Sequence, residues 1–125
     1  MSWSLEKLGH EGRSTRYAVY ALVIDGGSEA LDFLNDLEEP QFNKMQQLID
    51  RLSVEGFIAN REKFRRLDAG IYEMKLWAPP VRLFCFRDGT DWICTHGDRK
   101  PGERELQAHI AKVNTLRQHY REERK

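Results

Sequence analysis

The spacing of apolar residues predicts a strand followed by two helices in the first half of the chain. A continuous apolar run in Arg16–Ile24 is typical of a central strand that is buried on both faces. Helical spacing then extends from Ala30 to Leu37 and from Phe42 to Leu52. Ser28 is suited to cap the first helix, and Gly56 to end the second in a left-handed conformation. Because the link between them is short, the helices should form an antiparallel hairpin packed on a sheet.

The second half of the chain has the alternation and the turn residues of a meander. Strands are predicted at Lys63–Leu67, Ile71–Trp77, Val81–Phe86 and Trp92–His96, and a closing helix at about Glu103–Glu122. The predicted fold class is therefore α+β, with an N-terminal strand, a helical hairpin, an antiparallel sheet of about four to five strands and a C-terminal helix.

The chain has 125 residues, enough for one hydrophobic core and one domain. We place that domain at residues 16–125. Residues 1–15 are polar and have no clear period, so they are expected to form a loosely attached lead-in, with Trp3 and Leu5 as residues that could dock on the domain.

Alternation within Ile71–Trp77 divides its side chains between two faces. The core face, packed under the two helices, is expected to hold Tyr72, Met74 and Leu76. The other face is expected to be open and concave, and it holds Ile71, Glu73, Lys75 and Trp77.

Two cations on this second face suggest a binding site. If Ile71–Trp77 and Val81–Phe86 pair across a tight turn at Ala78 and Pro79, Lys75 lies opposite Arg82. Like charges placed opposite each other repel, and an anion such as phosphate between them would relieve the repulsion. The alternative is that both cations pair with Glu73, which lies within diagonal reach on the same face.

The charge of the chain is balanced overall but divided unequally. Lys and Arg number 20, as do Asp and Glu, which argues against a general polyanion binder. Residues 1–56 hold five basic and ten acidic residues, and residues 57–125 hold fifteen basic and ten acidic ones. The basic half contains the meander, so either one anionic partner binds on that side or the charges are ordinary surface scatter.

Several functional classes lack support in the sequence. The longest apolar run, Tyr17–Ile24, is too short to cross a bilayer, and no signal peptide is recognisable at the start. Cys85 and Cys94 lie among apolar neighbours and are expected to be buried free thiols, so the cytoplasm is the expected compartment. The four histidines have no ligand spacing with the cysteines, so neither a metal nor another cofactor is expected.

Arg, Lys and His on an antiparallel sheet can perform phosphoryl chemistry on RNA without a metal. The ribose 2′-OH is the nucleophile, so the protein needs only a base, an acid and cations that stabilise the charged phosphorane. Lys75, Arg82 and the segment His96-Gly97-Asp98-Arg99-Lys100 contain residues of these types. Crowding of cations lowers the pKa of a lysine or histidine, which suits either proton-transfer role.

These motifs resemble those of a known family. From Arg16 to Tyr120 the chain resembles the RelE/ParE superfamily of toxins from bacterial toxin–antitoxin modules, and it is most similar to the HigB-like, phage-derived branch. The resemblance rests on Tyr72-Glu73-Met74-Lys75-Leu76, on Val81-Arg82-Leu83-Phe84, and on the basic stretch His96–Lys100 before a proline and a closing helix.

The resemblance implies ribosome-dependent cleavage of mRNA, blocked by a cognate antitoxin that is expected to be a helix-turn-helix protein. It implies proton transfer by Lys75, charge stabilisation by Arg82, and a basic group near the leaving oxygen from Arg99 or Lys100. It allows His96 to act as acid or base. The remaining implied contacts, to the backbone of ribosomal RNA, belong to Lys63, Arg65 and Arg66.

Two positions depart from the family pattern and keep a second function class open. Glu73 stands where these enzymes place a second lysine, and Glu105 and Leu106 stand where they carry a tyrosine, with Tyr120 too far along. The alternative is a non-catalytic binding protein, either a ParE-like poison of gyrase or a degenerate toxin that only binds its antitoxin.

Overall fold

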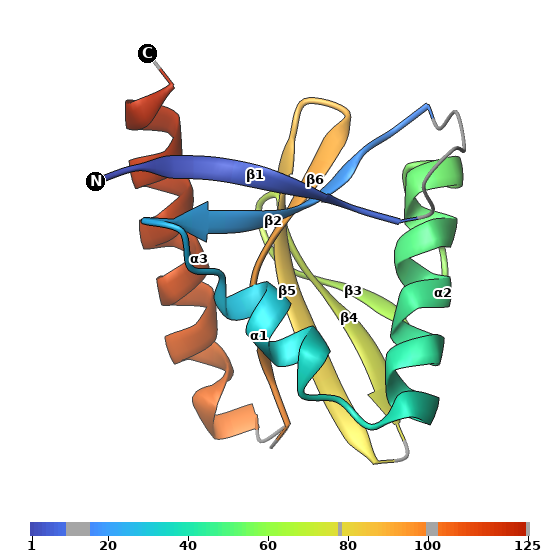
Figure 1. The fold of residues 1–125 in the computed structure, drawn as a ribbon. Helices are drawn as coiled ribbons and strands as arrows, with labels where there is room; N and C mark the ends of the chain where they lie inside the picture. The colour runs from blue at the N-terminus through green and yellow to red at the C-terminus, as the bar shows by residue number, and fades with distance from the viewer. Residues whose placement is uncertain (10–15, 78, 100–102, 125) are drawn as a thin grey trace.

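The computed structural model describes residues 1–9, 16–77, 79–99 and 103–124. Within these residues the elements run in a simple order along the chain (Figure 1). They are β1 (Trp3–Leu8), β2 (Val19–Ile24), α1 (Glu29–Asn35), α2 (Glu39–Glu55), β3 (Phe64–Asp68), β4 (Ile71–Trp77), β5 (Pro80–Asp88), β6 (Asp91–Asp98) and α3 (Glu103–Glu123).

All strands of the described chain belong to one sheet with the order β1-β2-β6-β5-β4-β3. Neighbours are antiparallel except β2 and β6, which pair in parallel. The α+β class and the C-terminal helix are confirmed. The expected antiparallel sheet of four to five strands is corrected to a mixed sheet of six. The parallel join of β2 with β6 depends on contact between distant segments of the chain, which local patterns do not reveal.

The first residues are part of the sheet and not a loosely attached lead-in. β1 pairs with β2 along its whole length, from Trp3 opposite Ile24 to Leu8 opposite Val19. The ring of Trp3 also stacks on that of His119 in α3, with 6.1 Å between centroids. β1 is an edge strand whose side chains are exposed or half-buried, so its sequence lacks the apolar run that marks a central strand.

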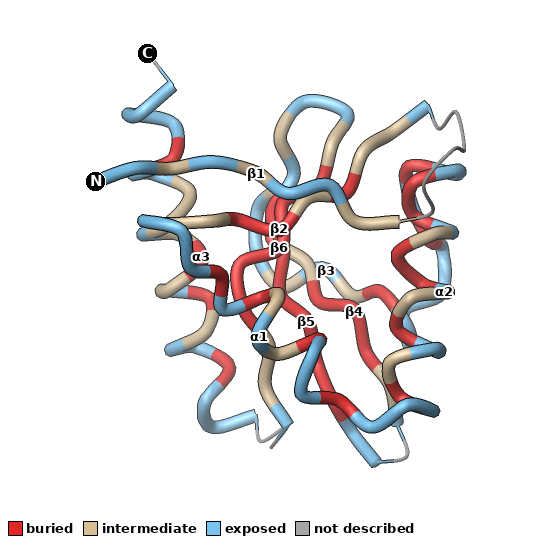
Figure 2. The backbone as a smooth tube through the Cα atoms, viewed as in Figure 1, coloured by how far each residue is buried: buried red, intermediate tan, exposed pale blue. Residues whose placement is uncertain are grey.

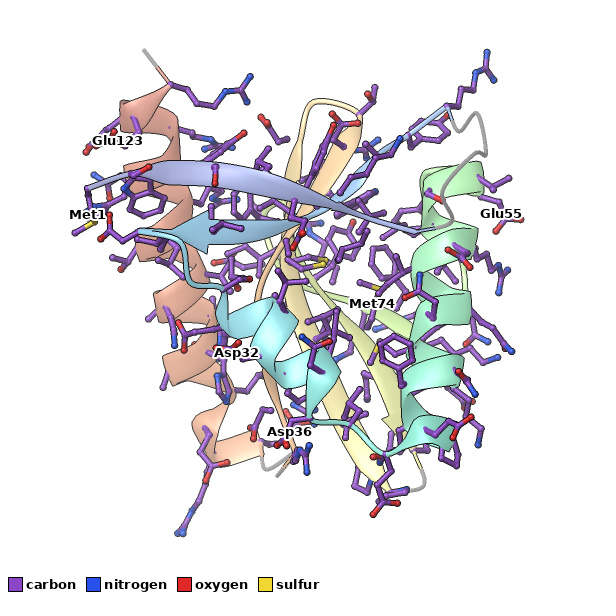
Figure 3. The ribbon with its side chains drawn as sticks, in the orientation of Figure 1. Met1, Asp32, Asp36, Glu55, Met74 and Glu123 are labelled. Carbon is purple, nitrogen blue, oxygen red and sulfur yellow. The ribbon has the colours of Figure 1, made fainter. Side chains whose placement is uncertain are left out.

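Helices cover both faces of the sheet (Figure 1), so the chain forms two hydrophobic cores. α1 and α2 pack on one face, where Met74 of β4 is fully buried near α2 (Figure 3). α3 packs on the other face, over residues of β2, β4, β5 and β6. The central strands β5 and β6 are accordingly the most continuously buried part of the tube in Figure 2.

The helix ends agree with the sequence signals. The Ser28 hydroxyl accepts a hydrogen bond from the Leu31 N–H at 3.2 Å, as an N-cap does. Gly56 ends α2 with φ of 77°, a left-handed conformation that favours glycine. Pro40 lies in the first turn of α2, where its missing N–H is not needed.

The face that the sequence suggested would be open and concave is covered. Ile71 is fully buried in the core beneath α3, and Glu73 and Lys75 are buried beside it. Only Trp77, at the end of β4, is mostly exposed. The sequence of β4 could not reveal this, because α3 arrives from a distant part of the chain.

Two further properties of the described chain concern its cysteines and its helices. Cys85 and Cys94 lie opposite each other on β5 and β6 as buried free thiols, as predicted, and burial raises the pKa of Cys85 well above its usual value. None of the described helices combines the length and hydropathy that a membrane crossing requires.

Candidate functional site

The pairing of β4 with β5 brings the two expected cations together. Lys75 lies directly opposite Arg82, as the sequence predicts, and the next pair on the same face is Glu73 opposite Phe84. Since β3 pairs with β4 so that Arg65 lies opposite Glu73, a third cation joins the group. Four charged side chains therefore occupy neighbouring positions on the α3 face of the sheet.

A carboxylate occupies the place where the sequence suggested a phosphate. The Glu73 Oε1 atom lies 3.0 Å from Arg65 Nη2 and 3.8 Å from Lys75 Nζ. Its Oε2 atom lies 3.5 Å from Arg82 Nη1. Glu103, at the start of α3, adds a second carboxylate to the cluster: its Oε1 atom lies 3.5 Å from Nη2 of both Arg65 and Arg82. The alternative of pairing with Glu73 is the arrangement found.

Burial determines how this cluster titrates. Glu73 is fully buried, and loss of water raises its pKa above the usual value against the opposing attraction of Arg82, Arg65 and Lys75. Burial also lowers the pKa of Lys75, and the attraction of Glu73 only partly compensates. A lysine with a lowered pKa releases its proton more easily than one in water, which is a property that an acid catalyst needs.

The two opposed cations remain reachable from one side. Lys75, Trp77, Pro80 and Arg82 line a small pocket of about 220 Å³ at the end of the β4–β5 pair. The Lys75 ammonium lies 4.1 Å from the centre of the Trp77 ring, which holds it in a cation–π contact. An anion that enters this pocket meets the side of the cluster that Glu73 does not fill.

A β-bulge in β6 directs His96 toward α3. Phe84 lies opposite His96 and Cys85 lies opposite Cys94, so Thr95 is an extra residue with no partner on β5. The bulge puts His96 on the face that holds Arg82 and Phe84. There the ring is buried and stacks on Phe84 at 4.9 Å.

Four side chains form a continuous hydrogen-bonded chain around His96. The Thr95 hydroxyl lies 2.8 Å from His96 Nδ1, His96 Nε2 lies 3.0 Å from His109 Nδ1, and His109 Nε2 lies 2.9 Å from Asp98 Oδ2. One set of directions satisfies the whole chain when Asp98 is ionised. Thr95 donates to His96, His96 donates to His109, and His109 donates to Asp98, so every donor has an acceptor. Both imidazoles are then neutral.

The environment of His96 supports the neutral form. Burial, aided by the positive charge of Lys112, lowers the pKa of His96 from 6.5 to about 4. With both ring nitrogens engaged, His96 positions His109 and does not itself reach the pocket. The role of His96 as acid or base stays a prediction. The hydrogen-bonded chain ends on Asp98, directly opposite Arg82.

His109 and Asp98 were not among the expected site residues. A signal for His109 was present, because it stands three residues after Leu106 and one before Ile110, on the apolar stripe of α3. No comparable signal marked Asp98. Its place beside the cations follows from the register of β5 with β6.

The other expected site residues are dispersed. Arg99 lies away from the cluster: its Nη2 donates to the Asp36 backbone oxygen and lies 3.0 Å from Asp36 Oδ2, at the C-cap of α1 on the opposite face. Arg66 is exposed and bonds the Asp68 backbone oxygen. Lys100 lies outside the described residues. Arg65 points to Glu73 in the cluster and not outward as expected, although its side chain is 26% exposed, and a contact with RNA stays a prediction.

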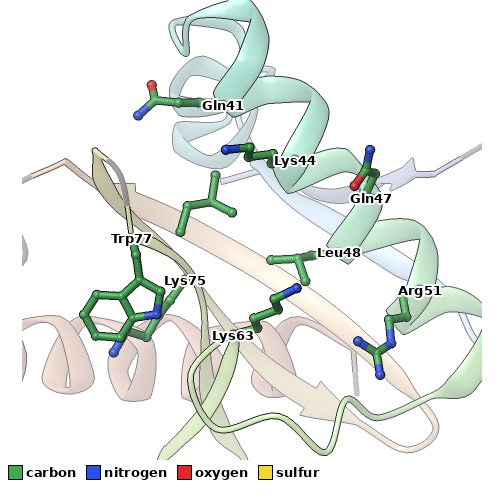
Figure 4. A pocket seen from close by; sticks show the side chains of 9 residues that line it. Gln41, Lys44, Gln47, Leu48, Arg51, Lys63, Lys75 and Trp77 are labelled. Carbon is green, nitrogen blue, oxygen red and sulfur yellow. The ribbon is translucent and has the colours of Figure 1, made fainter.

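Lys63 belongs to a different feature, a groove of about 550 Å³ between α2 and the β3–β4 side of the sheet (Figure 4). Lys44 and Arg51 of α2 line one wall, and Lys63 and Lys75 line the other. No carboxylate is among the lining residues. The groove shares Lys75 and Trp77 with the small pocket, so the two adjoin at these residues.

Chemically, the pocket end of the sheet combines a lysine of lowered pKa, an arginine and an Asp–His pair. This set can hold an anion and move protons near it. Among the described residues no group of three or more His, Cys, Asp or Glu side chains is placed to bind a metal ion.

Tyr120 lies far from the cluster around Glu73. Tyr120 is buried against Phe86 at the far end of α3, where its hydroxyl donates to Asp88 at 3.2 Å.

Comparison of the chain with protein-family models, with curated proteins and with solved structures gives no match.

Proposed function

We propose that this protein is the toxin of a toxin–antitoxin module of the RelE/HigB kind, and that it cleaves mRNA on the ribosome without a metal. The observation that carries the proposal is the pairing of Lys75 with Arg82 at a pocket that both residues line. Asp98, held by His109, lies directly opposite Arg82 on the next strand. Cations and a proton acceptor thus meet at one end of the sheet.

The reaction needs no group beyond these side chains and the RNA. The 2′ oxygen attacks the neighbouring phosphorus while Asp98, oriented by His109, takes the 2′ proton. Arg82 and Lys75 stabilise the negative charge of the phosphorane. As the bond from phosphorus to the 5′ oxygen breaks, Lys75 gives that oxygen a proton. The products are a 2′,3′-cyclic phosphate and a 5′-hydroxyl, and solvent returns the proton from Asp98 to Lys75.

The proposal includes the partners and compartment that the resemblance implies. The protein acts in the cytoplasm on ribosomes that carry mRNA, and a cognate antitoxin, a helix-turn-helix protein, blocks it. Because a toxin of this kind must be inhibited at its cationic surface, the antitoxin should present acidic side chains.

One observation favours a second candidate, a non-catalytic binding protein. Glu73 already neutralises the cations that should hold the phosphate, and it lies within 3.0 to 3.8 Å of three of them. A degenerate toxin that retains only antitoxin binding, or a ParE-like poison of gyrase, would need no free cation here.

The test is growth after inducible expression, with primer extension on an abundant mRNA. Asp98→Asn removes the proton acceptor while keeping the shape, and Arg82→Lys keeps a charge beside Glu73, so both variants should fold. Asp32→Asn makes the same change on exposed α1 and serves as the control. Growth arrest with cuts inside codons, lost in both site variants and kept in the control, supports the ribonuclease.

Two other results decide against it. Arrest without cuts indicates a gyrase-like target, and no arrest indicates a degenerate binding protein. Cuts that persist in Asp98→Asn at the wild-type rate overturn the assigned base.

A further inference from the structure

The groove between α2 and the β3–β4 side of the sheet is lined by basic side chains and by no acidic one. Lys44, Arg51, Lys63 and Lys75 line it, and no Asp or Glu does (Figure 4). Arg51 is partly neutralised by Glu55, 2.7 Å away on α2. Lys44 and Lys63 form no ion pair with any described residue, and both are exposed. Both side chains are therefore open to an anion from outside.

An exposed aromatic side chain stands at the end of the groove. Trp77 is 59% exposed although it is among the largest apolar side chains of the protein. Its indole N–H donates to the Glu62 backbone oxygen at 2.9 Å, and Lys75 lies against its ring. The ring is thus fixed in place with much of its surface open to solvent, as a stacking platform requires.

We infer that this groove binds a short single-stranded segment of RNA, with phosphates on Lys44 and Lys63 and a base stacked on Trp77. Cations along a groove that ends in a fixed aromatic ring are the combination that tracks a single strand. A nucleotide requires roughly 300 Å³, by comparison with ordinary ligand pockets, so a groove of about 550 Å³ holds one or two.

The groove adjoins the proposed catalytic pocket. Lys75 and Trp77 line both, so a strand held in the groove lies next to residues of the pocket that Arg82 also lines. This inference rests on the proposed function for the choice of RNA as the polyanion. The inference adds the site that holds the RNA segment next to the scissile phosphate.

The experiment measures binding apart from cleavage. A fluorescent 2′-O-methyl RNA decamer has no free 2′-OH, so the protein cannot cut it by the proposed reaction, and its anisotropy reports binding alone. We expect affinity to fall linearly on a log–log plot against salt concentration. Lys44→Gln and Lys63→Gln should each reduce that slope by about one.

The matched controls separate the groove from general charge. Lys7→Gln makes the same change on exposed β1, at the opposite edge of the sheet, and should leave the slope unchanged. Trp77→Ala should weaken binding by roughly 10-fold or more, and Trp77→Phe should restore most of the loss because it keeps a ring.

The outcomes distinguish this inference from the proposed function. If the protein cuts mRNA but the three groove variants bind the decamer as the wild type does, the groove assignment is overturned and the ribonuclease stands. If the groove variants lose binding and no cutting occurs, the groove assignment stands and the ribonuclease fails. Binding of a polyglutamate peptide with no binding of the decamer overturns the inference in favour of an acidic protein partner.

Discussion

The carboxylate of Glu73, which is fully buried, lies 3.5 Å from the guanidinium of Arg82. The same carboxylate contacts Arg65 and Lys75. Yet neither of its oxygens forms a hydrogen bond of good geometry with another described residue. The interaction is therefore one of charge more than of hydrogen bonding, and a different anion could take its place.

The first prediction follows from this relationship. Glu73→Gln leaves three cations together without a buried counter-charge, so it should lower the free energy of unfolding by about 3–5 kcal/mol. Sulfate, at the same ionic strength as a chloride reference, should restore part of this loss by entering the cluster. Urea unfolding in the two salts measures the effect, and the wild type corrects for the general stabilisation by sulfate. Equal sulfate effects in both proteins would contradict the prediction.

The second prediction concerns acid stability. Because burial lowers the pKa of His96 to about 4, the unfolded chain binds more protons than the folded one between pH 6.5 and 4. The free energy of unfolding should therefore decrease as the pH falls through this window, by about 3 kcal/mol from His96 alone. Urea unfolding at several pH values should show a flatter profile for His96→Gln. An unchanged profile in His96→Gln would contradict the prediction.

The third prediction tests the close contact of β6 with α1. A Cβ atom at Gly97 would lie 2.3 Å from the ring of Phe33, so Gly97→Ala should cost about 1–3 kcal/mol of stability. Adding Phe33→Leu should recover part of that cost, since the smaller side chain gives way. Gly27→Ala is the control, because its nearest neighbour, the Ile24 backbone oxygen, lies at an ordinary 3.7 Å. Thermal unfolding of the wild type and these three variants measures the effect, and a Gly97→Ala variant as stable as the wild type would contradict the prediction.

The fourth prediction concerns β1. Deleting residues 1–8 removes the whole ladder with β2 and leaves the backbone edge of β2 unpaired. We expect a lower midpoint in urea and association that increases with protein concentration, since open strand edges pair with one another. Light scattering during gel filtration measures the association. Lys7→Thr, which keeps the ladder, should stay at the wild-type mass, and a deleted form that remained equally monomeric and stable would mean that β1 is dispensable.

Local patterns were enough to predict much of this structure. β4 has the predicted bounds, and its register with β5 follows from the short turn between them, which left only one pairing for Lys75 and Arg82. The caps at Ser28 and Gly56 were equally local, because each depends on one residue and its immediate neighbours.

The features that the sequence did not reveal depend on contacts between distant segments or on a β-bulge that changes which face of the sheet a side chain occupies. A strict alternation along β6 would place His96 and Cys94 on the same face, whereas the bulge at Thr95 puts them on opposite faces. The burial of Glu73 and Lys75 depends on α3, and Arg99 turns to Asp36 because α1 packs beside β6. None of these arrangements has a signature within its own stretch of chain.

The parallel pairing of β2 with β6 also constrains the order in which the chain can fold. β3, β4, β5 and β6 follow one another closely and can pair by closing short loops, whereas β2 must wait until β6 exists. During synthesis β1 and β2 therefore leave the ribosome well before β6, the strand through which they join the sheet. The docking of this N-terminal pair onto a finished meander is the step with the highest contact order, and it should set the folding rate of the whole protein.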